Sequence, residues 1–582
     1  MGFQEFWDRW WRFIFIVFTP FLLAFVFFIE EPNNNCSETD PVTGACIGKT
    51  NLAAYIYILL WMGTYWVTNC IDMTATSLMP IILMPMFGVL GAKDVAPNYM
   101  KDIALLFLGG LLFAAAIEKT GLHRRLALTV MKIFGAKPHA LMAGFQICTW
   151  FLSMWISNTA TTAMVMPIAE SVFQVIEAQE KRRYERQGRE WKGPSAGIRK
   201  LFVGLTLAIP HSANIGGMAT VTGTPPNKIL VGHLEDNYPC MKPNTVDFGL
   251  WMAYAFPQSV LYMILAYFWL STYYIGWFGN VFCKGKIQPR EDLAQVGETE
   301  EDLKEIEAVI NDEYEKLGPI TKKLGEMIVS GLFVVLVLLW FFRAPAFGGF
   351  QHWFESGYVT DSTVVMFVSG FLFILPNDFP KFSTKKQKQP TKPILTWDEC
   401  TIPWGVIILI GGGYALSAGS KASGFGDMIK NAMVGLKGVA PWTVAFVITV
   451  IVGFATEFTS NTATESLLVS IVSETAVAIE INPLFLLMPM TLATSLAFML
   501  PIATPPNAIA FSYGRLTVRD MITSGAIMNV VGFALVVILV NTYGRAVFGS
   551  KQDPFNDTHF PQWANASVVG VNRDNCAAMV GY

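Results

Sequence analysis

Long apolar runs alternate with shorter polar segments along most of this chain. A window of about 20 apolar residues is long enough to cross a bilayer as a helix, and eleven segments fit that description. They lie near residues 12–29, 52–69, 74–90, 102–118, 200–232, 249–277, 325–342, 361–375, 403–420, 484–512 and 522–545. The pattern predicts an all-α polytopic membrane protein with about eleven transmembrane helices.

Two further apolar runs, near 139–172 and 439–475, are too long for one span and carry polar residues in the middle. Each fits a re-entrant helical hairpin. Lipid cannot satisfy backbone N–H and C=O groups, so irregular backbone at membrane depth must be buried in protein or line a cavity. We therefore expect the polar tips of both hairpins to be buried and functional.

The two tips have nearly the same sequence. Phe151–Thr161 reads FLSMWISNTAT, and Phe454–Thr464 reads FATEFTSNTAT, 303 positions later. A second signature follows each tip, GTPPN at Gly223–Asn227 and ATPPN at Ala503–Asn507, now 280 positions apart because of a charged insert near 180–200. The paired prolines should break each span there. Duplication of this kind is typical of a secondary transporter built from two inverted-topology repeats.

Composition agrees with this organisation. The chain has 582 residues, of which 53% are hydrophobic and 15% charged, and its mean hydropathy is +0.43. We expect an N-terminal span and outer loop (1–51), repeat 1 (52–282), a cytoplasmic linker (283–325), repeat 2 (326–545) and a C-terminal tail (546–582). Leu303, Ile306 and Ile310 predict an amphipathic helix in the linker. Its charge is typical of a solvated connection with no further role.

Basic residues cluster in three loops that fall on one side of the membrane if the spans are counted as above. Their members are Lys119, Arg124, Arg125 and Lys132; Lys181, Arg182, Arg183, Arg186 and Arg189; and Lys381, Lys385, Lys386, Lys388 and Lys392. The excess of positive charge predicts that this side is cytoplasmic. The N-terminus would then be cytoplasmic and the C-terminus extracellular, in a multi-pass plasma-membrane protein.

The predicted outer segments carry candidate modification sites. N-x-[ST] glycosylation triplets begin at Asn35, Asn556 and Asn565, all on the predicted outside. Cys36 and Cys46 share the first outer loop, where a disulfide and an unpaired state are both compatible with the sequence.

The repeated signatures offer uncharged oxygen atoms. Hydroxyl, amide and backbone oxygens suit a hard cation such as Na⁺, and the N-terminus of a half-helix favours an anion. Neither signature contains Arg or Lys, so a dianionic substrate would need co-bound cations to balance its charge. We expect co-transported Na⁺, in at least two sites, with lipid as the surrounding medium.

Other function classes find little support. The chain has only six His, and no His-rich cluster, Ser-His-Asp set or carboxylate pair lies among the spans. We therefore predict that the protein is not an enzyme, and we expect no nucleic-acid partner.

The motifs SNTATTAMVMPIAE, TGTPPN, SNTAT and ATPPN, with LGG and IGGG before the hairpins, resemble the divalent anion:sodium symporter family, solute-carrier family 13. The resemblance covers residues 61–543. It implies a homodimer with scaffold and transport domains, an elevator motion, and Na⁺-driven transport of dicarboxylates, tricarboxylates or sulfate.

The resemblance also implies site residues. The first sodium site is similar to Ser153, Ser157, Asn158 and Gly223, and the second to Thr456, Ser460, Asn461 and Ala503. Substrate carboxylates would meet Asn158, Thr159, Thr224, Asn461, Thr462, Thr504 and Pro505.

Substrate choice stays open within this resemblance. Thr462 favours carboxylates over sulfate, and succinate, citrate and α-ketoglutarate remain alternatives, as do a sodium-independent carboxylate exchanger and a sodium-coupled sulfate transporter. The glycines at 411–413 are interpreted as helix-packing residues. Glu465 departs from the family pattern, and we hypothesise that its titration makes transport pH-sensitive.

Overall fold

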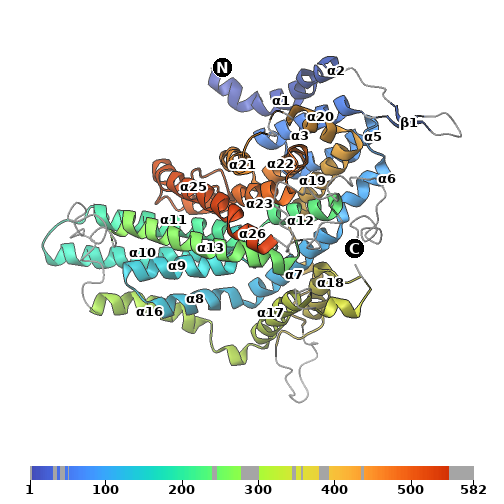
Figure 1. Ribbon diagram of the computed structural model, residues 1–582. Helices are drawn as coiled ribbons and strands as arrows, with labels where there is room; N and C mark the ends of the chain where they lie inside the picture. The colour runs from blue at the N-terminus through green and yellow to red at the C-terminus, as the bar shows by residue number, and fades with distance from the viewer. Residues whose placement is uncertain are drawn as a thin grey trace.

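The structure is a computed structural model of the full chain (Figure 1). It describes residues 3–29, 36–39, 46–49, 51–238, 246–276, 300–343, 349–355, 358–378, 392–400, 402–433, 435 and 438–548. The predicted glycosylation sites Asn35, Asn556 and Asn565 lie outside these residues, and their modification stays a prediction.

The part of the chain before the charged linker is mainly helical. Its elements are α1 (Phe3–Leu23), α2 (Val26–Ile29), β1 (Cys36–Thr39), β2 (Cys46–Lys49), α3 (Leu52–Thr68), α4 (Met73–Ser77), α5 (Met79–Met86), α6 (Ala92–Val95), η1 (Ala96–Met100), α7 (Asp102–Thr120), α8 (Leu122–Phe134), α9 (Pro138–Ser153), α10 (Asn158–Arg186), α11 (Ala196–Gly217), α12 (Pro225–Asn237), α13 (Phe248–Leu270) and η2 (Ser271–Ile275).

The remainder is helical as well. Its elements are α16 (Glu300–Lys316), η3 (Ile320–Lys322), α17 (Leu324–Arg343), η4 (Phe350–Trp353), α18 (Asp361–Gly370), η5 (Phe371–Phe373), η6 (Trp397–Glu399), α19 (Trp404–Ala422), α20 (Phe425–Met433), α21 (Pro441–Ala455), α22 (Asn461–Ala478), α23 (Pro483–Thr494), α24 (Pro505–Ser512), α25 (Val518–Asn541) and α26 (Tyr543–Phe548).

The apolar spans are divided more finely than the sequence suggested. Within the described residues, six helical segments are long and apolar enough to cross a membrane: Ala92–Thr120, Asn158–Arg186, Phe248–Ile275, Leu324–Arg343, Trp404–Ala422 and Val518–Phe548. Shorter apolar helices account for much of the rest, and the predicted spans 200–232 and 484–512 each become two helices. Proline explains part of this division, because it opens α12 and α24, where its missing N–H leaves no hydrogen bond unmade.

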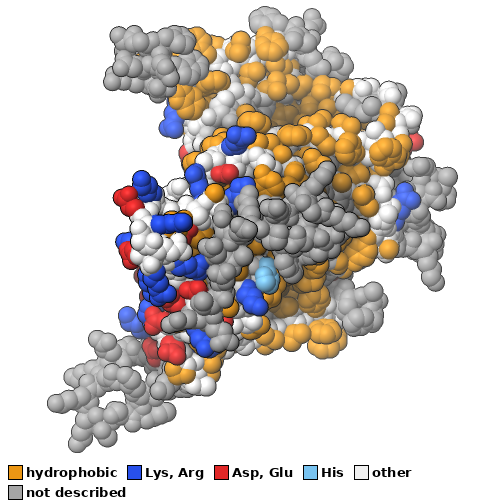
Figure 2. Space-filling model, turned by 90° about the vertical axis from the view of Figure 1, so that its left-hand side faces the viewer, with side chains coloured by type: hydrophobic (Ala, Val, Ile, Leu, Met, Phe, Trp, Pro, Cys, Tyr) orange, Lys and Arg blue, Asp and Glu red, His pale blue; other side chains and the backbone are white. Residues whose placement is uncertain are grey.

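The surface of the described residues fits a membrane environment. Phe21, Met86 and Ile133 are each about three-quarters exposed, and a broad hydrophobic surface is visible in Figure 2, with charged side chains gathered on one side. An apolar surface of this extent requires an apolar neighbour. The protein is a multi-pass membrane protein.

The N-terminal strands bear on the proposed disulfide. β1 and β2 pair antiparallel with Cys36 opposite Lys49 and Cys46 opposite Thr39, so the two cysteines are not cross-strand partners. Their side chains lie outside the described residues, and the disulfide stays a prediction.

The predicted linker helix is present as α16, but it is more than a solvated connection. Ile306 and Ile310 are buried where α16 packs against α8 and α10. Arg182 pairs with Glu305 at 2.5 Å, and Arg183 pairs with Asp302 at 3.0 Å. The prediction that α16 only connects the two repeats missed this packing, because the density of charged residues does not show which surface a helix packs against.

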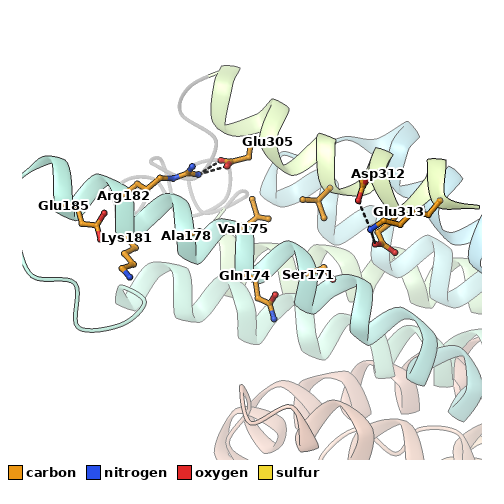
Figure 3. A pocket seen from close by; sticks show the side chains of 12 residues that line it. Ser171, Gln174, Val175, Ala178, Lys181, Arg182, Glu185, Glu305, Asp312 and Glu313 are labelled. Carbon is orange, nitrogen blue, oxygen red and sulfur yellow. Dashed lines mark hydrogen bonds and ion pairs between the residues drawn. The ribbon is translucent and has the colours of Figure 1, made fainter.

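A surface groove of about 580 Å³ lies between α10 and α16 (Figure 3). Gln174, Val175 and Lys181 line it from α10, and Glu305 and Asp312 line it from α16. Its acidic side chains are largely engaged: Glu305 pairs with Arg182, and Asp312 pairs with Lys316. The groove therefore belongs to the α10–α16 contact.

Candidate functional site

The first tip joins α9 to α10 through residues 154–157. Ser153 is buried, and its Oγ donates to the Asn158 Oδ1 at 2.6 Å. Ser157 caps α10, accepting a hydrogen bond from the Ala160 N–H at 3.2 Å. The tip thus gathers hydroxyl and amide oxygens at the N-terminus of α10, where the helix dipole is positive.

The second tip repeats this arrangement between α21 and α22. The Thr456 hydroxyl lies 2.8 Å from the Asn461 Oδ1 and 2.9 Å from the Thr494 carbonyl oxygen. Thr456 and Asn461 are each 303 positions after Ser153 and Asn158. The duplicated sequence therefore gives a duplicated hydroxyl–asparagine contact.

The helix breaks are also equivalent. The Asn227 amide nitrogen, at the start of α12, donates to the Gly217 and Thr220 carbonyls at 3.1 and 2.7 Å. The Asn507 amide nitrogen, in α24, lies 3.0 Å from both the Ala497 and the Leu500 carbonyls. Asn507, Ala497 and Leu500 each lie 280 positions after Asn227, Gly217 and Thr220, respectively. In both places the asparagine of the TPPN signature holds the irregular backbone that precedes it.

Each tip contacts its own break. The Asn158 amide lies 3.3 Å from the Asn214 Oδ1, and the Thr220 hydroxyl donates to the Met154 carbonyl at 2.6 Å. A Cβ added at Gly217 would lie 2.5 Å from the Asn158 Oδ1. A larger side chain at 217 would therefore displace the asparagine of the first tip.

The two halves meet across the same region. α10, which starts at the first tip, packs against α24, and α22, which starts at the second tip, packs against α12. The Asn214 amide donates to the Ala497 carbonyl at 3.3 Å, which links the last turn of α11 to the second break. In Figure 1, α12 lies beside α22 and α23 despite its distance in sequence. The tips and breaks thus form one continuous polar region.

Comparison with known proteins places this architecture in a family. A family model described as "Sodium:sulfate symporter transmembrane region" matches residues 46–549. The rat Na(+)/citrate cotransporter is 37% identical, covering 88% of this chain and 93% of the relative. The human Na(+)/dicarboxylate cotransporter 3 is 34% identical, covering 96% and 95%. The chain belongs to the sodium:sulfate symporter family.

The family resemblance found in the sequence is therefore confirmed. A solved structure, the YdaH transporter of Alcanivorax borkumensis, is similar to this symporter-family chain with a TM-score of 0.50 at 11% identity, covering 92% of this chain and 99% of that one. At this identity the likeness concerns the fold alone.

Within this symporter-family chain, the predicted sodium ligands lie at the tips and breaks. Ser153, Thr456 and Ala503 are buried, Asn158, Ser460 and Asn461 are half-buried, and Ser157 is exposed. A Cβ at Gly223 would lie 2.4 Å from the Gly217 carbonyl oxygen, so the close approach at this predicted ligand requires glycine. The structure joins Ser153 to Asn158 and Thr456 to Asn461, and ion binding by the two sets stays a prediction.

The predicted substrate residues occupy the same region. Thr224, Thr462 and Thr504 are buried, whereas Thr159 and Pro505 are exposed. The expectation of wholly buried tips therefore holds only for part of each tip. Thr224 and Thr504 are the N-caps of α12 and α24 and have extended backbones, as the following proline requires.

The glycines at 411–413 serve close packing in the symporter-family fold. A Cβ at Gly411 would lie 2.6 Å from the Tyr99 Cδ1, and one at Gly413 would lie 2.6 Å from the Ser466 Oγ. The packing interpretation of these glycines is confirmed.

One buried carboxylate lies in the turn of the second tip, and another lies in the first turns of α22. Glu457 accepts hydrogen bonds from the backbone of Phe498, Met499 and Leu500 and from the Asn529 amide, which lies 2.7 Å away. Glu465 is fully buried, and its Oε1 lies 2.7 Å from the Thr491 hydroxyl. Of these two carboxylates, Glu457 is the one that accepts hydrogen bonds from the backbone of the second break.

Sequence reasoning missed Asn214, the anchoring role of Glu457 and the buried Lys228 that follows the first TPPN signature. The acid at 457 was visible but unassigned, and Lys228 is one residue beyond the motif. Their significance depends on tertiary contacts that no sequence spacing displays.

Proposed function

We propose that the protein is a sodium-coupled symporter of di- and tricarboxylates of the succinate, citrate and α-ketoglutarate class, acting across the plasma membrane. The observation that carries this proposal is the pair of equivalent hydroxyl–asparagine tips, each facing a helix break held by a second asparagine. Relatives named as Na(+)/citrate and Na(+)/dicarboxylate cotransporters support the substrate class.

The chemistry of the tips fits alkali-metal ions. Ser153, Asn158, Thr456 and Asn461 supply neutral oxygens, which can replace part of the hydration shell of Na⁺. Each tip also opens a helix, α10 or α22, whose N-terminus favours an anion. A tip can thus hold a cation and a substrate carboxylate side by side.

Coupling follows from charge balance. A dianion in a low-dielectric site requires compensating cations, and any excess of Na⁺ charge over substrate charge moves through the membrane potential. Each net positive charge then contributes about 2.3 kcal/mol per 100 mV. Inward accumulation of the carboxylate is the expected result.

The larger architecture is part of the proposal. Residues 52–282 and 326–545 form two inverted repeats, and the re-entrant hairpins lie near 139–172, in α9 and the first part of α10, and near 439–475, in α21 and α22. A transport domain moves against a scaffold in an elevator cycle. The protein acts as a homodimer, with its N-terminus cytoplasmic and its C-terminus extracellular. The constant offset of 303 positions between the tips, and of 280 positions between the breaks, supports the duplication.

Sodium dependence is tested by radiolabelled succinate uptake into cells or proteoliposomes, with Na⁺ replaced by choline. A symporter loses uptake, whereas a sodium-independent exchanger keeps it. Competition by unlabelled succinate, citrate, α-ketoglutarate and sulfate at two pH values then ranks substrates by size and charge. Competition by sulfate alone would reject the carboxylate assignment.

The shared site is tested by substitution at both tips. Asn158→Ala and Asn461→Ala should each abolish sodium-coupled uptake while the protein still reaches the surface. Asn541→Ala is the matched control, because its side chain donates within α25 to the Val537 carbonyl, away from the tips. Normal kinetics in either tip variant would reject a site built from both halves.

A further inference from the structure

A buried lysine stands beside the first helix break. Lys228 directly follows Asn227 in α12 and is only 2% exposed. Its Nζ donates to the Thr222 carbonyl at 3.0 Å and lies 3.8 Å from the centroid of the Phe107 ring. The carbonyl and the ring face can each stabilise an ammonium group, whereas burial opposes its charge.

This charge has no carboxylate partner among the residues that the structure describes. An ammonium group has three donors, and the Thr222 carbonyl accepts from one of them. Glu235 and Asp236 lie about two turns further along the same helix, and Asp236 pairs with Lys101 at 2.5 Å. Burial of a cation without a counter-charge is unfavourable, so an anion bound beside the amine would stabilise its charged form.

The second half shows that the break itself does not need a lysine. The residue 280 positions after Lys228 is Ala508, and there Asn507 holds the Ala497 and Leu500 carbonyls as Asn227 holds the equivalent pair. The two breaks therefore have the same backbone support, and only one carries a buried positive charge. A purely structural role for Lys228 leaves that difference unexplained.

The Lys228 amine lies at the N-terminal end of α12. Long side chains on a helix lean toward its N-terminus, and Lys228 accordingly reaches back to Thr222, two residues before the N-cap Thr224. The N-terminus of α12 is itself positive. A positive charge on Lys228 and the positive end of the α12 dipole would therefore act on the same part of the site.

We propose that Lys228 is a fixed counter-charge for one carboxylate of the transported anion, in the half-site that contains Asn158 and Thr224. The inference rests on the proposed function and adds a specificity residue to it. The lysine attracts the carboxylate and repels Na⁺ bound at the first tip. Removing the charge must therefore weaken substrate binding and strengthen sodium binding, two changes of opposite sign.

The test uses Lys228→Met, which keeps the length of the side chain, Lys228→Ala, which reproduces position 508, and Lys228→Arg, which keeps the charge. For Lys228→Met and Lys228→Ala we expect the succinate KM to rise at least about tenfold, because each variant loses one attractive charge pair. The Na⁺ concentration for half-maximal uptake should fall severalfold, with the maximal rate within about twofold of wild type. Lys228→Arg should stay close to wild type in both constants.

Opposite shifts support the counter-charge, because a packing defect weakens both ligands together. Joint weakening in Lys228→Met and Lys228→Ala, or unchanged constants in both, would overturn the inference. If these variants fail to reach the surface, Phe107→Leu keeps the lysine while removing the ring face. It should shift both constants in the same opposed directions by a smaller factor, and the absence of opposed shifts there would also overturn the inference.

The outcome is separable from the proposed function. If wild-type uptake survives replacement of Na⁺ by choline, sodium coupling fails, while the succinate KM of the Lys228 variants still reports on the counter-charge. If coupling holds and the two constants do not move apart, Lys228 alone is wrongly assigned.

Discussion

Glu457 offers the most direct test of how the second helix break is held. Its Oε1 accepts from the Phe498 N–H at 2.8 Å, the Met499 N–H at 3.0 Å and the Asn529 amide at 2.7 Å, and its Oε2 accepts from the Leu500 N–H at 3.2 Å. The three backbone donors belong to the segment between α23 and α24, and Asn529 belongs to α25. Glu457→Gln changes one acceptor oxygen to an NH₂ donor with almost no change in volume.

The size of the effect follows from the number of bonds. A hydrogen bond to a charged group contributes about 1.5–3 kcal/mol, against about 1 kcal/mol for a neutral one. If the glutamine oxygen takes the Oε1 position, the bond from Leu500 is lost and the other three become neutral. The ordered break then loses about 3 kcal/mol or more, which corresponds to a factor of about a hundred in its population. Because Ala503 and Thr504 follow this segment, the loss should reach the predicted second sodium site.

The assay is sodium activation of succinate uptake, normalised to surface protein. We expect the Na⁺ concentration for half-maximal uptake to rise at least tenfold in Glu457→Gln. Glu118→Gln is the matched control, since its carboxylate is exposed on α7, and it should leave the curve unchanged. A wild-type sodium curve in Glu457→Gln would refute the view that this carboxylate holds the break.

Three further outcomes are expected. Gly217→Ala places a Cβ 2.5 Å from the Asn158 amide oxygen, so sodium affinity measured by uptake should fall about tenfold, for an overpacking penalty of about 1–3 kcal/mol. Gly331→Ala is the control and should be neutral, because a Cβ at that position meets no atom within 4 Å. Equal sodium-activation curves for the two variants would contradict the contact. Glu465→Gln should flatten any pH dependence of uptake that remains after correction for substrate protonation, and an unchanged profile would remove the titration hypothesis. The Arg182 guanidinium lowers the pKa of Glu305, so their pairing is complete above the usual carboxyl range and is lost as the pH falls through the lowered pKa. Spin labels on α10 and α16 should therefore report a broader distance distribution at about pH 2.5, below the usual carboxyl range, than at about pH 7.5, and identical distributions would count against ionic docking.

The tips and breaks could be predicted from sequence because their signals are local and duplicated. The paired prolines that start at Pro225 and Pro505 begin half-helices, since they lack the N–H that would continue a helix from the preceding turn. Single prolines such as Pro210 and Pro489 lie inside helices. The polar SNTAT strings mark the turns of the hairpins for a similar reason: Ser157 and Ser460 are the N-caps of the returning helices. These features depend on residues within a few positions of one another.

The missed features depend on contacts across long stretches of sequence. Asn214 bonds to the first tip and also to the Ala497 carbonyl, 283 positions away. α16 docks through Ile306 and Ile310 on helices that precede it, although its composition is that of a solvated segment. Hydropathy identifies the buried face of such a helix, and only the fold identifies what covers it.

The two halves share their neutral framework and differ in their buried charges. The hydroxyl–asparagine contacts of the tips and the asparagine–carbonyl contacts of the breaks recur at fixed offsets, whereas Lys228 flanks only the first break and Glu457 binds only the second. Neutral oxygens suffice to surround a sodium ion, so duplication alone can supply two ion sites. A substrate with carboxylates at both ends meets a different electrostatic environment in each half. Its orientation and its selection over other anions must then depend on residues outside the repeated signatures, and variants at those residues should change substrate preference more than they change the requirement for sodium.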